Sequence, residues 1–405
     1  MIMLSETQLA ALPLPAQNMF KQLETDIITR ICSRIGEIGA LSETDVLKLN
    51  ELQNIGYDIQ AIQNEIAATL NKSTEEIYNI FSKAAEAEYA SLGKTFIPFE
   101  QNAQLQVLVQ SISNATAETF KNISKTSALQ LLNRNGKFQI IETTYKQAVD
   151  YAALLVRTGQ QDFYGAARQT IKNLSDGGAS VMYESGVIRR LDTAVRTNIL
   201  GAQAELSRQQ AELTGKQFGA DGWEISWHSG FRPTHTFGGL QFSKKDFENK
   251  EWGGTGKSVS ELMEEPNCYH RKFPIILGVS EPAYSQEQLD KYNSAEKETH
   301  KFNGAEYNRY EATQRQRQYE TAIRQQKDRA NAFDAAGDKE SATLARAKAN
   351  AINQEYKRFS ETMKIDTQPK RAAVSGYSGN YSKKLYQALT SRNKSSIISS
   401  GGGKL

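Results

Sequence analysis

The chain has 405 residues, and its 49 Lys and Arg nearly balance its 46 Asp and Glu, which leaves a net charge of +3. Eight Pro, 28 Gly and two Cys exclude a collagen-like chain and a disulfide scaffold, and they favour a reducing compartment or an indifference to redox state. No apolar run approaches the roughly 20 residues that cross a bilayer, and the first residues lack a basic leader with a sustained apolar stretch, so we expect neither membrane insertion nor a secretory signal.

The first 200 residues predict long helices and no sheet. Apolar residues recur at helical spacing over 16–35 and again over 46–66, where Ser42 is expected to cap the second run. The motif Ser73-Thr74-Glu75-Glu76 fits a capping box, so a third helix is expected to start there. A fourth helix is expected over 100–123.

Two further helices are predicted before the composition changes. One starts near Thr143, and the other carries an apolar stripe from Ile188 to Leu206. Arg189, Asp192 and Arg196 lie off this stripe. We expect these charges on a solvated face, where ion pairs contribute little to stability.

Residues 215–282 differ from the rest of the chain, because they hold all three Trp, three of the four His and many Gly. The stretch from Trp223 to His228 alternates like a β-strand, and 273–277 is a second strand candidate. This segment is therefore expected to form a compact α+β module.

A glycine-rich stretch within this segment, Gly253 to Ser258, has some features of a phosphate-binding loop. The pattern requires a glycine where Glu251 stands, and no apolar strand precedes the loop. Ser258 and Glu261 instead fit a capping box for a short helix. We therefore expect a structural turn rather than a nucleotide site.

Helices are expected to return after Pro282. Ser285 and Gln288 fit another capping box, and a long polar helix is predicted from there to about Phe333. Gly337 allows a turn into a second polar helix that ends near Met363. The remaining residues are rich in Ser and Gly and are expected to be disordered unless bound.

The sequence thus predicts an α+β fold in which predominantly long helices flank a small central α+β module, followed by a basic disordered C-terminal tail. Four consecutive regions are expected. They are a helical N-terminal region (1–180), the α+β module (181–282), long polar helices (283–363) and a basic flexible tail (364–405).

The charge is unevenly distributed. Residues 291–405 carry 22 basic and 12 acidic side chains, about +10, which leaves about −7 on the other 290 residues. Tyrosines 377, 381 and 386 lie between the basic residues and would suit base stacking. A solubilising tail, or an arm that docks on an acidic protein, is the alternative. The candidates for contacts with DNA phosphates are Lys364, Lys370, Arg371, Lys383, Lys384, Arg392 and Lys394.

Four residues of the central module, His228, His235, Cys268 and His270, have the side chains of zinc ligands. Their spacing, His-x6-His followed by Cys-x-His, matches no common zinc finger. A hydrogen-bonded core in which these residues satisfy backbone groups is the alternative, so we expect no cofactor and leave zinc open. A metal-dependent hydrolase or a Cys/His nucleophile pair could use the same residues.

The same segment resembles a known family. Its motifs recur in this order and spacing in the phage minor capsid protein 2 family of tailed phages, which is related to the Mu F-like head morphogenesis proteins. The resemblance covers about residues 190–282, and the family often has Arg where Tyr269 stands. The residues that carry it are Arg196-Thr197, Trp223, His228, Arg232-Pro233-Thr234-His235, Gly238-Gly239, Pro266-Asn267-Cys268-Tyr269-His270, Pro274 and Gly278.

The resemblance implies a structural protein of the virion and not an enzyme, made in the bacterial host cytoplasm and present in few copies inside the phage capsid. It implies contacts with the portal protein, with scaffold or major capsid protein, and with packaged DNA. It provides no catalytic residues. A metal-dependent hydrolase, or a toxin delivered with the genome, that uses His228, His235, Cys268 and His270 remains the alternative.

Overall fold

The computed structural model describes residues 6–42, 51–90, 99–123, 128–183, 185–384 and 386–387. The chain divides into two compact units. The first takes residues 1–17, 71–120 and 195–314, and the second takes residues 18–70, 121–194 and 315–405. Several long helices contribute residues to both units.

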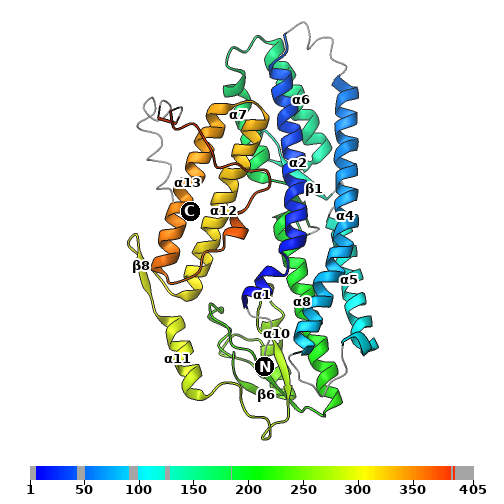
Figure 1. Cartoon of the computed structure of the whole chain (residues 1–405), viewed down its shortest axis with the longest axis vertical. Helices are drawn as coiled ribbons and strands as arrows, with labels where there is room; N and C mark the ends of the chain where they lie inside the picture. The colour runs from blue at the N-terminus through cyan, green and yellow to red at the C-terminus, as the bar shows by residue number, and fades with distance from the viewer. Residues whose placement is uncertain are drawn as a thin grey trace. The chain divides into compact units, whose positions relative to one another are not determined.

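Helices dominate the structure, and the predicted mostly helical α+β fold is confirmed (Figure 1). None of the described helices is both long and apolar enough to cross a membrane. The helices are α1 (Glu6–Ala11), α2 (Leu14–Gly39), α4 (Glu51–Ala90), α5 (Ala103–Ile123), α6 (Ile141–Arg157), α7 (Phe163–Gly177), α8 (Leu191–Gln217), α9 (Lys244–Asn249), α10 (Val259–Met263), α11 (Gln286–Lys297), α12 (Arg309–Ala335) and α13 (Lys339–Thr362), with single 3-10 turns η1 (Phe99–Gln101) and η2 (Pro369–Ala372). The strands are β1 (Leu129–Leu132), β2 (Phe138–Ile140), β3 (Ser180–Met182), β4 (Ile188–Arg190), β5 (Gly222–Ile225), β6 (Gln241–Ser243), β7 (Lys272–Ile275), β8 (His300–Phe302) and β9 (Ala305–Tyr307).

The capping box expected at Ser73 does not start a helix. Ser73 is buried in the middle of α4, which runs without a break from Glu51 to Ala90. Helical residues on both sides already satisfy the backbone there, so the local motif has no end to cap. The cap expected at Ser42 would act on residues 43–50, which lie outside the described part of the chain.

The second unit contains a four-stranded antiparallel sheet, in the order β2-β1-β3-β4, where the sequence analysis predicted only helices. That prediction was wrong because each strand has only three or four residues, too few to show a period of two. Tight turns with glycines at positive φ, Gly136 at 72° and Gly186 at 79°, connect the strands of each hairpin.

The sheet is built from an internal repeat with an offset of 50 residues. In each copy a hairpin leads directly into a helix, β1-β2 into α6 and β3-β4 into α8. Ile141-Glu142-Thr143 at the start of α6 corresponds to Leu191-Asp192-Thr193 at the start of α8. The inner strands pair antiparallel, with Gln130 opposite Ser180, its own equivalent in the other copy. The two copies are therefore related by a local pseudo-twofold axis.

The polar helix expected from Ser285 to Phe333 is interrupted. Ser285 does form the predicted capping box with Gln288, but α11 ends at Lys297. A two-stranded hairpin, β8-β9, follows and turns at Asn303 and Gly304, which have φ values of 49° and 84°. Asn-Gly is a strong signal for such a turn, because both residues tolerate positive φ. Asn303-Gly304 is thus the turn signal of this hairpin, but the strands on either side of it have only three residues each.

Helices α12 and α13 lie side by side in the second unit (Figure 1), joined by the predicted turn at Gly337, where φ is 85°. The Tyr319 ring lies 6.3 Å from Tyr356 and 5.4 Å from Phe359, centroid to centroid. These helices have a thin apolar stripe, and aromatic rings at helical spacing make the contact between them.

The segment after α13 corrects the expected start of the flexible tail. Lys327 donates to the carbonyl of Ala372 (2.6 Å), Asn331 donates to Ser375 (2.9 Å), and Arg346 donates to Ser378 (2.8 Å). Side chains of α12 and α13 therefore satisfy three backbone carbonyls between residues 372 and 378. These hydrogen bonds hold the segment against the helices although it has few apolar side chains. Residues 388–405 lie outside the described part of the chain.

A network of buried charges joins four elements of the second unit. Arg190 of β4 pairs with Glu24 of α2 and, at 2.9 Å, with Asp328 of α12. Asp192 of α8 pairs with Arg324 of α12 and is only 2% exposed. The expectation of a solvated Asp192 was wrong, because its partner lies 132 residues away in the sequence. Arg189 is exposed, as expected.

We predict that Glu24 makes the free energy of unfolding depend on pH. Burial, opposed by Arg190 and supported by Asp328 and Asp192, raises the pKa of Glu24 from 4.5 to about 7. The folded state then binds more protons than the unfolded state between these values. Its stability is therefore highest at low pH and falls as pH rises through 7, by up to about 3 kcal/mol.

Glu24→Gln is expected to reduce this slope, with Asp328, whose pKa burial also raises, supplying the remainder, while the exposed Glu37→Gln is expected to keep it. Urea unfolding at several pH values between 4.5 and 7.5 measures the slope for each variant. Parallel pH profiles for the wild type and Glu24→Gln would contradict the assignment.

Candidate functional site

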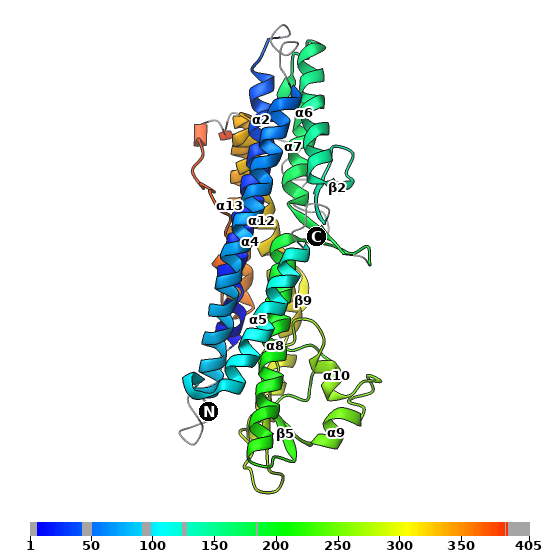
Figure 2. The ribbon, with the colours of Figure 1, turned by 90° about the vertical axis from the view of Figure 1, so that its right-hand side faces the viewer.

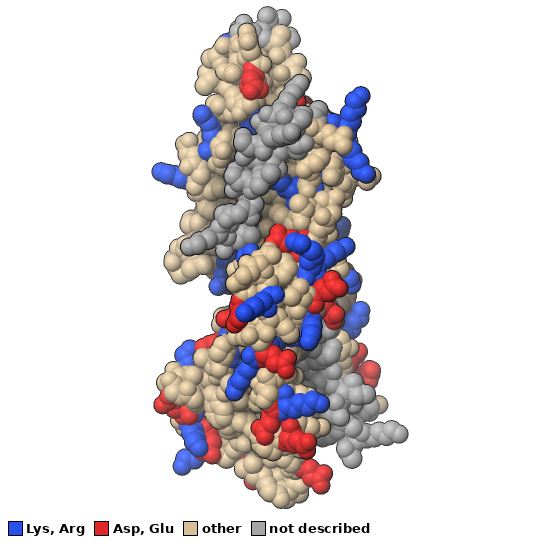
Figure 3. Space-filling model, turned by 90° about the vertical axis from the view of Figure 1, so that its left-hand side faces the viewer, with Lys and Arg blue, Asp and Glu red and all other residues tan. Residues whose placement is uncertain are grey.

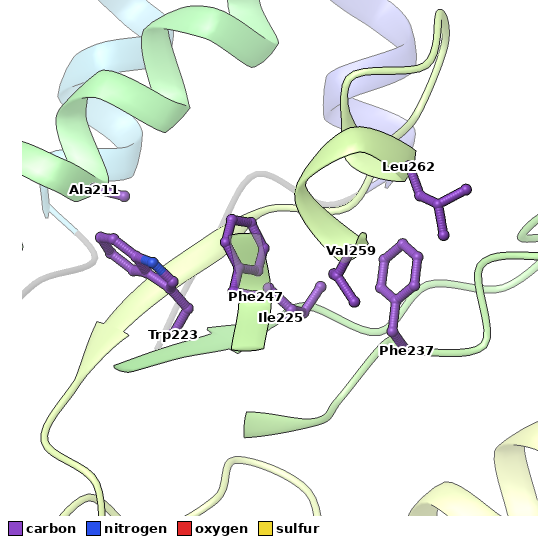
Figure 4. Close-up of a cluster of buried hydrophobic side chains, with 7 residues drawn as sticks. All are labelled: Ala211, Trp223, Ile225, Phe237, Phe247, Val259 and Leu262. Atoms are coloured by element: carbon purple, nitrogen blue, oxygen red, sulfur yellow. The ribbon is translucent and has the colours of Figure 1, made fainter. Parts of the chain in front are cut away.

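The central module of the first unit is a small sheet, in the order β6-β5-β7, with one apolar cluster against it. The predicted strands at Trp223 and Phe273 are confirmed as β5 and β7. Helices α9 and α10 lie beside this sheet (Figure 2). Figure 4 shows the Trp223 and Phe247 rings alongside each other, with centroids 6.5 Å apart. The cluster consists of Ala211, Trp223, Ile225, Phe237, Phe247, Val259 and Leu262.

Two loops beside this cluster bring the motif residues together. One follows β5 and contains Arg232 and His235, and the other precedes β7 and contains Cys268 and His270. Backbone bonds join the loops at their bases, where Ser226 donates to the carbonyl of Arg271 (2.8 Å). The loops are thus extensions of two neighbouring, paired strands.

Two motif arginines fix the loop that precedes β7. Arg196 of α8 donates to the hydroxyl of Tyr269 (2.6 Å) and to the side-chain oxygen of Asn267 (3.4 Å). Arg232 donates to Glu265 (2.7 Å) and to the carbonyl of Pro266. Asn267 has a φ of 63°, a conformation that non-glycine residues rarely adopt, and these contacts hold it there.

Three of the four expected zinc-ligand residues meet at these loops. Cys268 Sγ lies 3.7 Å from His235 Nδ1 and 3.4 Å from His270 Nδ1. One potential ligand atom from each residue lies within 4.8 Å of the other two. His228 is not part of this group, although its ring lies against His270 with centroids 4.2 Å apart.

The cluster is buried, and its titration follows from that burial. Both His235 and His270 are 2% exposed. Burial, followed by the charge of Arg232, lowers the pKa of His235 to about 4. Burial and the nearby His228 lower the pKa of His270 well below its ordinary value, and burial raises the pKa of the Cys268 thiol. At neutral pH the two rings are therefore uncharged and present free nitrogen lone pairs.

A pocket of about 320 Å³ opens beside the cluster. Cys268 and His270 line it, together with Asn267, Arg208 and residues of α8 such as Thr197. Glu205 and Arg208 also line the pocket and form an ion pair (2.6 Å), and Arg208 pairs in addition with Glu212 (3.1 Å). One part of the pocket therefore contains the uncharged Cys268 and His270 side chains, and another part contains charged side chains that already form ion pairs.

Glu265 is the residue of this site that the sequence analysis missed. Its carboxylate accepts from Arg232 and from Lys257 (2.8 Å), and it lies 3.5 Å from His235 Nε2. Lys257 holds the pKa of Glu265 below its ordinary value, so it is ionised at neutral pH. Its sequence neighbourhood, Glu264-Glu265-Pro266, gives no signal beyond that of an exposed acidic turn.

The glycine-rich stretch forms the structural turn expected of it. Ser258 and Glu261 make both hydrogen bonds of the capping box at the start of α10. The amide of Gly256 donates to the Glu251 carboxylate (2.9 Å). A carboxylate thus occupies a backbone donor that a phosphate loop would offer to its ligand.

The candidate DNA-binding residues follow the last helix in two groups. Lys364, Lys370, Lys383 and Lys384 are exposed. Arg371 is partly buried and lies 4.0 Å from Glu320. Arg392 and Lys394 lie outside the described part of the chain.

The tyrosines expected to stack on bases have partners within the chain. Tyr377 lies beneath Lys327, with Nζ 5.2 Å from the ring centroid, and Tyr381 packs edge-on against Tyr386. Base stacking would therefore have to displace these contacts.

A second, polar cavity of about 520 Å³ belongs to the second unit and is lined by α2 and α4. Its charges pair with one another, Arg30 with Glu65 and Arg34 with Asp58 (3.0 Å), and Tyr145 donates to Asp58. We interpret this cavity as a seam between paired helices.

Comparison with known proteins identifies a family over most of the chain. A family model described as phage minor capsid protein 2 matches residues 4–361. No curated protein and no solved structure matches the chain. The match includes both the central module, where the resemblance was found, and the helices before and after it.

We predict that Tyr269→Phe destabilises the loop that precedes β7. The change removes the acceptor of the 2.6 Å bond from Arg196 and leaves the ring contact with His228 in place. The expected cost is about 1 kcal/mol in the free energy of unfolding. Tyr57→Phe, at a side chain that is 76% exposed, is the matched control and is expected to be neutral. If both substitutions changed the free energy of unfolding equally in denaturant titrations, the hydrogen bond from Arg196 to Tyr269 would not stabilise this loop.

Proposed function

The chain belongs to the phage minor capsid protein 2 family, and from this we infer that it lies inside the capsid, beside the portal, with its basic C-terminal region facing packaged DNA. The single observation that carries the proposal is the family match over residues 4–361. Membership makes the chain a structural component of the phage capsid, and it does not favour an enzyme.

The distribution of charge supports the contact with DNA. Lys370, Lys383 and Lys384 are exposed near the end of the chain. On the face shown in Figure 3, Lys and Arg are interspersed with Asp and Glu. DNA binds most tightly where basic side chains are not already paired with acidic ones, because each new phosphate contact then releases a counterion from the DNA. Residues 367–387 meet that condition in the sequence, because they contain four basic side chains and no acidic one.

An exposed apolar edge of the central module supports docking on another capsid component. Val279 is 74% exposed, and Phe218 and Leu277 are more than a third exposed. Asp221 accepts from the amide of Leu277 (2.8 Å), which joins the turn after α8 to the loop after β7. Exposed apolar side chains on a rigid edge are typical of protein–protein contacts.

Two measurements on purified particles test the location. Protease treatment of intact virions is expected to leave the chain whole, whereas treatment after disruption is expected to cleave it. An asymmetric cryo-electron microscopy reconstruction is expected to show helical density of this protein at the portal vertex. Cleavage in intact particles, or density spread evenly over all vertices, would contradict the proposal.

We predict that DNA binding depends on the basic C-terminal region. The triple variant Lys370→Gln, Lys383→Gln, Lys384→Gln is expected to weaken binding to duplex DNA and to flatten the plot of log affinity against log salt. The slope is expected to change by up to about 0.9 for each phosphate that the variant no longer neutralises.

The control carries Lys216→Gln, Lys245→Gln and Lys250→Gln, three exposed positions of the first unit with the same total charge change. It is expected to bind as the wild type does. Fluorescence anisotropy at two salt concentrations compares the three proteins. Equal losses of affinity in the two triple variants would show that net charge alone attracts DNA and would reject a specific C-terminal contact.

A further inference from the structure

The side chains of His235, Cys268 and His270 converge at distances that fit a shared metal ion as well as hydrogen bonds to sulfur. The two sulfur–nitrogen distances are 3.7 and 3.4 Å. Around a tetrahedral zinc ion, with Zn–S of about 2.3 Å and Zn–N of about 2.0–2.1 Å, the sulfur and nitrogen ligands lie about 3.6 Å apart. The two measured edges thus already have the length that a shared ion requires.

Hydrogen bonding leaves this cluster incomplete. The Nε2 atom of His270 is buried and has no hydrogen-bond partner among the described residues, and the Nε2 atom of His235 has only the Glu265 carboxylate, 3.5 Å away. The thiol can donate its proton to one of the two Nδ1 atoms that face Cys268 Sγ, and the other Nδ1 can then only donate its own N–H to the sulfur. A hydrogen-bonded core, the alternative expected from the sequence, would therefore offer both Nδ1 atoms only a sulfur, which is a weak hydrogen-bond partner. Two neutral imidazoles and a thiol that converge on one point are instead a typical soft-ligand set for zinc.

Beside the cluster, the Glu265 carboxylate lies where it would orient a metal-bound His235 ring. If Nδ1 of His235 binds a metal, its Nε2 carries the proton and needs an acceptor. Glu265 lies 3.5 Å from that atom and is held in place by Arg232 and Lys257. This is the carboxylate–histidine arrangement that orients metal-bound imidazoles. Glu265 also offsets some of the positive charge that an ion would add beside Arg232 and Arg271.

We propose that His235, Cys268 and His270 bind one zinc ion that fastens the two loops of the central module to each other. The ion takes the thiolate form of Cys268, since a coordinated thiol loses its proton, and this offsets the raised pKa of the free thiol. His228 packs on His270 but does not ligate. Cys268 and His270 also line the adjacent pocket, which leaves room for a water molecule as the fourth ligand.

The loops give this metal a structural purpose. Apart from α9 and α10, which have six and five residues, the chain between β5 and β7 has only the three-residue strand β6 as regular structure. The apolar cluster has seven buried members, a small core for such a loop-rich segment. Where a core is small, a metal that binds only the folded arrangement adds its binding free energy to folding.

The test uses the full chain expressed in zinc-supplemented medium and desalted before elemental analysis. About one zinc ion per chain is expected, and a chelator is expected to lower the melting temperature. Replacement with Co²⁺ alone is expected to give visible bands of tetrahedral intensity and a thiolate-to-cobalt charge-transfer band. Only a trace of zinc, no thiolate band with Co²⁺ and a melting temperature that ignores the chelator would overturn the proposal.

Matched variants assign the ligands. Cys268→Ser and His270→Gln are expected to lose the metal, while His228→Gln and Cys32→Ala are expected to retain it. Glu265→Gln keeps all three ligands and is expected to weaken zinc binding by about 10- to 100-fold in competition with a chromophoric chelator. This variant keeps the proposal testable even if a ligand variant fails to fold. Wild-type affinity in Cys268→Ser, or loss of zinc from His228→Gln with retention in His270→Gln, would reject the assigned ligands.

Discussion

Long helices with so little apolar surface can pack only if the charges that they bury meet charges of opposite sign. In the second unit Arg190 lies between Glu24 and Asp328, and Asp192 meets Arg324. Each of these charges carries a desolvation cost on burial, and removing one partner would leave the other buried and unpaired. Such a network adds little net stability over an apolar core, but it tolerates only one register of the helices that carry it. It therefore explains how polar helices can still adopt a defined arrangement.

The internal repeat shows how the network was built on one copy of a common element. Glu142 at the start of α6 forms an ordinary exposed pair with Lys146, four residues later. Its equivalent at the start of α8 is Asp192, which is buried with Arg324, and the equivalent of Lys146 is Arg196, which binds Tyr269. The same hairpin–helix unit thus has a solvated charged face in one copy and two specific contacts in the other. Sequence similarity between the copies does not imply similar environments.

The sequence predicted what depends on local patterns and missed what depends on distant partners. The periodic helices, the caps at Ser258 and Ser285, and strands β5 and β7 follow from residues a few positions apart. The four-stranded sheet was missed because three-residue strands carry no measurable period. Asp192 was misassigned because its partner is 132 residues away. In the candidate site, side-chain chemistry identified three residues that do converge, but only the fold separates them from His228 and adds Glu265.

The central module and the polar helices both bury titratable side chains, and they avoid the cost of unpaired buried charges in different ways. The helices bury full charges and pair them, whereas the module buries neutral imidazoles and a thiol whose ordinary pKa values burial has shifted toward the uncharged forms. Neutral side chains cost less to bury than charged ones, but the Nδ1 atoms of the two rings have only the Cys268 sulfur as a partner. A proton is disfavoured there, because Arg232 and Arg271 already lie beside the rings. A divalent ion at the site proposed above would bind both Nδ1 atoms and the sulfur together, and the thiol would release its proton to solvent and become a compensating anion.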